Sequence, residues 1–252
     1  MDIKPLQFGD EGQVATRELA ARFGQLASRL RQAMPSWSGR LDALGRRIGI
    51  LEVLDRQHGG SGAIEAEETE SLAAAVLSGL AGLGADARRL PIEALDREIA
   101  DLVIATAVWA MRHELRIDAL EPVVNALAFR SNTAATAQEL AAVFGLMQGV
   151  IANVAPLLAP DLERSNPERP WRILHLNFAL TAIRTADTRL IDHAFDALDA
   201  GLPDERGAFY AEALARALAP GIAPPVRERI AERHLKWTRP VPIGDNQRFP
   251  QG

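Results

Sequence analysis

The chain has 252 residues, of which 48% are hydrophobic, 24% are charged and only 5% are aromatic. This composition is typical of a globular protein with a sizeable core, filled here mainly by alanine and leucine, two strong helix formers. It contains no cysteine, which excludes disulfides, thiolate metal sites and a cysteine nucleophile. The formal charge of -5 argues against a nucleic-acid partner, because nucleic-acid binders usually carry a basic face.

The first segment, residues 1–58, is predicted to be an amphipathic helical hairpin. Pro35 interrupts its apolar pattern, so Met34 to Ser36 predicts a tight turn between two antiparallel helices, with Ser36 or Ser38 capping the second. Before the pattern begins, MDIKPLQFGDEGQ lacks a charged-then-apolar targeting signal, so we expect a bacterial-type cytoplasmic protein unless a leader has been removed. The apolar residues recur at steps of three and four: Leu19, Phe23, Leu26, Leu30, Met34, Trp37, Leu41, Leu44, Ile48 and Leu51.

This hairpin has two ways to bury its apolar stripe, against its own domain or against another molecule. Its arginines, from Arg17 to Arg47, could meet an acidic helix, and the glycine link from Gly59 to Gly62 would let the hairpin move relative to residues 65–237. Intramolecular packing is the commoner outcome for so short a pattern. Self-association, or binding of a protein partner through the hairpin, is the alternative that we carry forward.

The middle of the chain reads as consecutive helices. Acidic residues open a helix through Leu72, Val76 and Leu80, and Gly82, Gly84 and Pro91 predict the turn after it. Two further helices are predicted over 92–115 and 118–129. We therefore expect short connections between antiparallel neighbours in this part of the chain.

The stretch from Glu139 to Pro160 predicts the central helix, with residues 139–158 as its body. No charged side chain follows Glu139 until Asp161, and large apolar residues recur at helical spacing with alanine and glycine between them. A helix that is apolar on most sides belongs in the centre of a bundle or in a membrane. Because polar residues and a proline interrupt the run, we favour the bundle and expect no membrane insertion.

The last third is predicted to form four helices, over 171–185, 189–200, 205–218 and 226–237, followed by a tail at 238–252. Residues 107–112 resemble 179–184, and 120–127 resemble 191–198, so residues 65–237 are a candidate two-unit repeat around the central helix. The predicted fold class is all-α: a multi-helix bundle or short α-solenoid of antiparallel hairpins, with about nine to ten helices.

The sequence supplies no catalytic, cofactor-binding or metal-binding motif. No two histidines are spaced by four residues, and neither a phosphate loop, a serine elbow nor a dinucleotide glycine motif is present. Four polar residues are candidates for partner binding. Arg112 and Arg184 lie near helix ends in the two candidate repeats, where they could line a groove for an acidic peptide or bind terminal carbonyls. His175 and Asn177 lie on a mostly buried helix and need hydrogen-bond partners.

Two functional classes follow. The first is a non-enzymatic protein-interaction module, a helical scaffold or adaptor that holds another protein in a groove or on its N-terminal hairpin. The alternative is a helical-bundle enzyme or small-ligand-binding protein, in which the four polar residues converge on an internal pocket. A long concave surface favours the first class, and a closed cavity with convergent polar groups favours the second.

Overall fold

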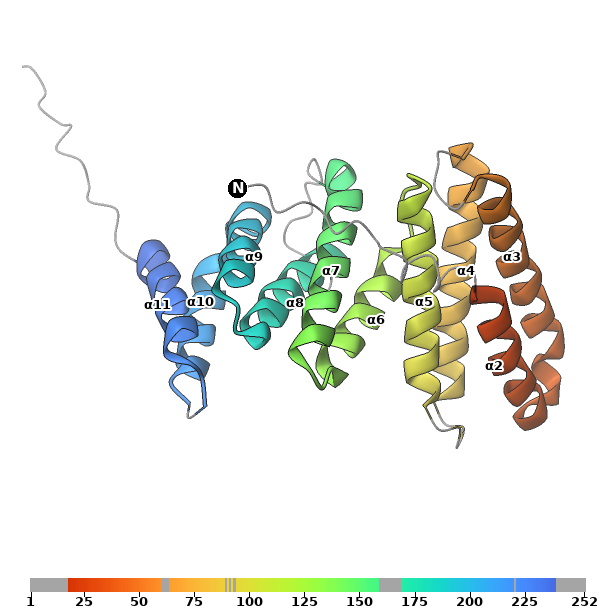
Figure 1. Ribbon diagram of the computed structural model, residues 1–252, viewed down its shortest axis with the longest axis horizontal. Coiled ribbons are helices and arrows are strands. Elements are labelled where there is room, and N and C mark those ends of the chain that lie inside the picture. The colour runs from red at the N-terminus through yellow and green to blue at the C-terminus, as the bar shows by residue number, and fades with distance from the viewer. Residues whose placement is uncertain are drawn as a thin grey trace, which may run out of the picture. The chain divides into compact units, whose positions relative to one another are not determined.

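The computed structural model describes residues 18–59, 64–88, 90, 92, 94–158, 169–219 and 221–238 (Figure 1). These residues form ten α-helices and one short 3-10 helix and contain no strand, which confirms the predicted all-α multi-helix fold. The chain separates into two compact units, Met1–Thr185 and Ala186–Gly252. The predicted division into segments 1–58, 65–237 and 238–252 stays a prediction.

The first unit contains seven of the helices. They are α2 (Leu19–Ala33), α3 (Ser38–Gln57), α4 (Ala66–Ala87), α5 (Leu95–Arg112), α6 (Leu120–Thr133), α7 (Ala137–Leu158) and α8 (Pro170–Thr185), with the 3-10 helix η1 (Pro35–Trp37) between the first two. Consecutive helices from α2 to α8 pack against each other, and α2 also contacts α5 (Figure 1).

The N-terminal hairpin is built as the sequence predicts, with one difference at the cap. Pro35 starts η1, which turns the chain between α2 and α3. Ser38 does not cap α3: its hydroxyl donates to the carbonyl oxygen of Pro35, because Ser38 is already the first residue of the helix. The apolar stripe is buried within the unit, where α2 contacts α5 and α3 contacts α4. The buried residues of the stripe are Leu19, Phe23, Leu26, Leu30, Leu41, Leu44, Ile48 and Leu51.

Intramolecular packing is therefore how this stripe is used. Ion pairs reinforce it, since Arg29 of α2 pairs with Glu98 of α5 and Arg40 of α3 pairs with Asp86 of α4. Of the predicted glycine link, Gly59 has a positive φ of 66°, and residues 60–62 lie outside the described residues. Arg17 also lies outside them.

The predicted turn at Gly82 and Gly84 is wrong, because α4 continues through both residues to Ala87. A Cβ at Gly84 would lie 3.3 Å from Ile99 of α5, and one at Gly82 would lie 2.9 Å from the Arg40 guanidinium. Gly84 therefore gives Ile99 of α5 room to pack closely on α4, whereas the Arg40 guanidinium is the end of a flexible side chain that could move away from a Cβ at Gly82.

The predicted central helix is α7, and it is buried on one face rather than on most sides. Its large residues point inward, whereas Ala141, Ala142 and Ala152 are exposed. The small side chains leave little apolar area in contact with water, so a face of alanines is tolerated without a neighbouring helix. The buried residues are Leu140, Val143, Phe144, Met147, Val150 and Val154.

The second unit contains α9 (Thr188–Gly201), α10 (Arg206–Ala217) and α11 (Pro224–Thr238). Together with α8, these helices match the four predicted for the last third of the chain to within two residues at each end. Both α9 and α10 pack on α11. The predicted tail beyond 238 and most of the predicted loop, residues 163–168, lie outside the described residues.

The candidate repeat has a local counterpart in the backbone. Two residues after Arg112, Glu114 has a φ of 57°, and two residues after Arg184, Ala186 has the same φ. Left-handed backbone is uncommon for residues with a side chain. The helices that follow, α6 and α9, each have 14 residues. This likeness supports the repeat, which stays a prediction.

Candidate interaction surfaces

Arg112 and His113 end α5, and both contact Asp55 of α3. The Nε2 atom of His113 lies 3.0 Å from an Asp55 carboxylate oxygen, and the Arg112 guanidinium lies 3.4 Å from the same oxygen. None of the three side chains is more than 7% exposed. Trp109, one turn before His113, packs against the imidazole with ring centroids 4.9 Å apart. Arg112 therefore joins two helices and offers little surface to a partner.

Arg184, in the last turn of α8, contacts α6. Its Nη1 donates to the carbonyl oxygen of Ser131, close to the end of α6. The Ser131 hydroxyl lies 2.8 Å from the Thr181 hydroxyl, which in turn lies 3.6 Å from the sulfur of Met147. This is the kind of carbonyl contact that the second interpretation of Arg184 predicts, although the carbonyl belongs to another helix.

His175 is buried one turn after Trp171 in α8. Its Nδ1 lies 3.0 Å from the Trp171 carbonyl oxygen, and the two rings meet edge to face at 4.0 Å between centroids. Burial lowers the pKa of His175, an effect that the carbonyl contact only partly opposes. Asn177 is half-buried on the same helix. The buried histidine thus has the hydrogen-bond partner that its position requires.

Three of these four residues have contacts in different parts of the protein. Arg112 contacts α3, Arg184 contacts α6, and His175 contacts its own helix. None of the four lines either of the two grooves described below. Their predicted role in partner binding stays a prediction.

A second polar cluster, which sequence reasoning missed, surrounds Asp199 of α9. Its carboxylate accepts hydrogen bonds from the Tyr210 hydroxyl at 2.9 Å, the Arg233 guanidinium at 2.8 Å and the Trp237 indole at 3.0 Å. Arg206 stacks on the Trp237 ring, 3.5 Å from its centroid. Burial, together with the Asp199 charge, raises the pKa of Tyr210 far above its usual range, so the hydroxyl stays a donor.

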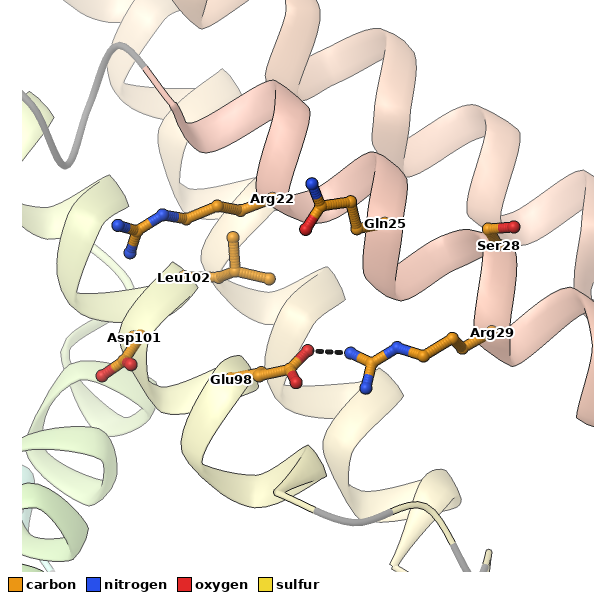
Figure 2. Close-up of a pocket in the computed structure, with 7 residues that line it drawn as sticks. All are labelled: Arg22, Gln25, Ser28, Arg29, Glu98, Asp101 and Leu102. Carbon is orange, nitrogen blue, oxygen red and sulfur yellow. Dashed lines mark hydrogen bonds and ion pairs between the residues drawn. The ribbon is translucent and has the colours of Figure 1, made fainter.

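A polar groove of about 670 Å³ lies between α2 and α5 (Figure 2). We refer to it as the α2–α5 groove. Arg29 points across it toward Glu98, as Figure 2 shows. Its lining residues are Arg22, Gln25, Ser28 and Arg29 from α2, and Glu98, Asp101 and Leu102 from α5.

Every charged residue that lines the α2–α5 groove has an ion-pair partner. Arg22 pairs with Glu18 at 2.9 Å, Arg29 pairs with Glu98, and Asp101 lies 3.4 Å from Arg130 of α6. Burial raises the pKa of Asp101, although Arg130 opposes the shift. The charges of this groove are satisfied within the protein, which favours a structural role for them.

A second groove, of about 500 Å³, is formed by α4, α5 and α6, and we refer to it as the α4–α5–α6 groove. Its floor is apolar and consists of Ile99, Ala100 and Val103 from α5 and Ala126 and Phe129 from α6. Ala81, Gly82, Gly84 and Ala85 of α4 form one wall, and Arg88, Asp96, Glu121, Pro122 and Asn125 complete the lining. The floor is packed, with Ile99 7% exposed and Phe129 half-buried.

Three exposed charges surround this apolar floor: Arg88 after the end of α4, Asp96 in the first turn of α5 and Glu121 in the first turn of α6. Within the described ranges, none of them forms an ion pair, in contrast to the charges of the α2–α5 groove. The α4–α5–α6 groove therefore combines an apolar centre with exposed charged groups at its edge.

Two further features of the described residues concern metal binding and membrane insertion. The described residues contain no group of three or more His, Asp or Glu side chains arranged to hold a metal ion. One stretch, Ala137–Ala155 in α7, is long and apolar enough to cross a membrane, with 39% of it buried inside the protein. The core helix of a helical bundle has the same length and apolar composition.

Comparison with known proteins assigns no family, since no protein-family model, curated protein or solved structure matches the chain.

Proposed function

We propose that the chain is a non-enzymatic protein-interaction module, a helical scaffold or adaptor of the cytosol. The observation that carries this proposal is the α4–α5–α6 groove, with its apolar floor and a rim of exposed charges that form no ion pair with any described residue. Protein interfaces share this anatomy, because apolar burial at the centre supplies affinity while polar groups at the edge supply orientation. The groove is open, as a surface for a macromolecule must be.

The polar residues of the protein also support this class. A small-ligand site needs several polar groups that converge on a cavity. Here the polar clusters hold helices together: Asp55 with Arg112 and His113 is buried, and Asp199 with Tyr210 is partly buried. Because they are engaged in these contacts, they favour a rigid scaffold over an enzyme.

The proposal can be tested by site-specific photo-crosslinking in the native host. A photoreactive amino acid replaces Asn125, which is exposed at the groove, or Ala141, which is exposed on α7 and serves as the matched control. We expect a discrete crosslinked protein from position 125 and none from position 141. Adding Ala85→Arg, which fills the groove from an exposed site, should abolish the product. Equal products from both positions, or none from position 125, would contradict the proposal.

A further inference from the structure

We infer that the α4–α5–α6 groove binds an amphipathic helix of a partner protein, one with an apolar stripe and with lysine or arginine on its flanks. The inference rests on the proposed function and names the class of partner. Three properties of the groove carry it: the floor, the α4 wall and the charge of the rim.

The floor fits an apolar stripe. Ile99, Ala100 and Ala126 line the groove with 5–7% of their surface exposed, and the half-buried Phe129 lies beside them in the lining. A volume of about 500 Å³ lies within the range of pockets that take up several side chains. Helices dock in such grooves through apolar residues spaced by three, four and seven positions.

The α4 wall permits the backbone of a helix to approach. Ala81 and Ala85 present only methyl groups to the groove. Gly82 and Gly84 add no side chain to this wall, and Gly84 is already in close contact with Ile99. Small residues at a contact favour the shorter end of the 8–10 Å range of distances between packed helix axes.

The rim selects the charge of the partner. Among the described lining residues, Asp96 and Glu121 contribute two carboxylates and Arg88 contributes one guanidinium, so this part of the lining is net acidic. Both carboxylates lie in first turns, where the helix dipole stabilises them, and both stay exposed. Basic residues on the partner would form ion pairs at this rim. Such pairs raise the association rate and fix orientation more than they raise affinity.

The experiment uses a displayed library of helix-forming peptides, selected for binding to the full chain. Binders are then sorted by their response to two variants with the same substitution: Ala85→Arg in the groove and Ala141→Arg on the exposed face of α7. We expect a class of peptides that loses binding at least tenfold to Ala85→Arg and keeps it to Ala141→Arg. Their sequences should show an apolar stripe at helical spacing and an excess of lysine and arginine.

The charge of the rim is tested on the same peptides. The double variant Asp96→Asn with Glu121→Gln should weaken groove-dependent binding about fivefold to tenfold and flatten its dependence on salt. Binders that are acidic, or that lack an apolar stripe, would overturn the inference, as would the absence of any groove-dependent binder. The proposed function would then still stand if position 125 crosslinks to a protein partner, and it would fail if that crosslink is missing.

Discussion

Two aspartates connect helices in the two units, and they do so differently. Asp55, late in α3, contacts Arg112 and His113 of one neighbouring helix. Asp199, late in α9, accepts hydrogen bonds from α10 and α11, and so joins all three described helices of its unit. A carboxylate near the end of a helix meets the negative end of its dipole. Neither residue therefore stabilises its own helix, and both stabilise contacts between helices.

The difference reflects the size of the two cores. Small domains bury a smaller fraction of their surface than large ones. The large buried side chains of α9, α10 and α11 are few, namely Ile191, Phe195, Leu198, Tyr210, Val226 and Ile230. Asp199 adds hydrogen bonds where apolar burial is limited. Asp55 lies in a unit with a large apolar core, where it fixes the contact of α3 with α5.

The largest effect is expected for Asp55→Ala. Removing one partner from a buried ionic cluster typically costs about 3–5 kcal/mol, since Arg112 and His113 stay buried without the carboxylate. Urea denaturation followed by circular dichroism measures the loss. Asp86→Ala is the control, because Asp86 pairs with Arg40 at the surface and should cost at most about 1 kcal/mol. An equal loss of unfolding free energy in the two variants would show that the buried cluster of Asp55 contributes no more than a surface ion pair.

Asp199→Ala should come next, with a loss of about 3 kcal/mol, because three donors lose an ionised acceptor. Hydrogen exchange measured by mass spectrometry locates the effect. Protection should fall across α9, α10 and α11 together, whereas Asp55→Ala should lower it in α3 and α5. If only α9 loses protection, Asp199 does not join the three helices.

His175 provides a contrast with His113, because its partner is the Trp171 carbonyl and not a carboxylate. Burial lowers the pKa of His175 below 6.5, so the unfolded chain takes up a proton that the folded protein resists. Protonation of His175 therefore does not reduce the free energy of unfolding above about pH 6.5. Below that pH the free energy of unfolding falls, by at most about 1.4 kcal/mol per pH unit. Urea midpoints between about pH 7 and pH 5 should decline less in His175→Gln. The exposed His58→Gln is the control, and identical slopes for both variants would refute the assignment.

Tyr210→Phe should have the smallest effect, about 1 kcal/mol, because it removes one hydroxyl donor and leaves Arg233 and Trp237 on Asp199. The ring packing on Phe195 is retained. The measurement is again the urea midpoint. A loss as large as that of Asp199→Ala would mean that the hydroxyl, rather than the carboxylate, organises the cluster.

The helices could be predicted from the sequence because apolar spacing records burial directly. The four helices of the last third match the prediction closely, and the stripe from Leu19 to Leu51 is buried as its period indicates. The turn predicted at Gly82 and Gly84 was wrong, since α4 continues through both residues and Gly84 is placed by its contact with Ile99 of another helix. Local propensity does not contain that information.

The polar clusters could be predicted only in part. Asp55 follows Leu51 by four residues and Asp199 follows Phe195 by four, so each continues an apolar face with a carboxylate. A carboxylate at a position of the apolar face is the sequence signal that could have indicated each cluster. The partners could not be named, because His113 is 58 residues from Asp55 and Trp237 is 38 residues from Asp199. The α4–α5–α6 groove could not be predicted either, since it depends on the angles between three helices.

The contacts of Asp199 can form only late in the synthesis of the chain. Arg233 and Trp237 are made 34 and 38 residues after Asp199. At about 5–20 residues per second, the ribosome adds the later partner roughly 2–8 s after the aspartate. Until then α9 has no α11 to pack on. A message cut short before Arg233 would therefore release a chain whose α2 to α8 are complete and whose last helices have lost the contact that joins them.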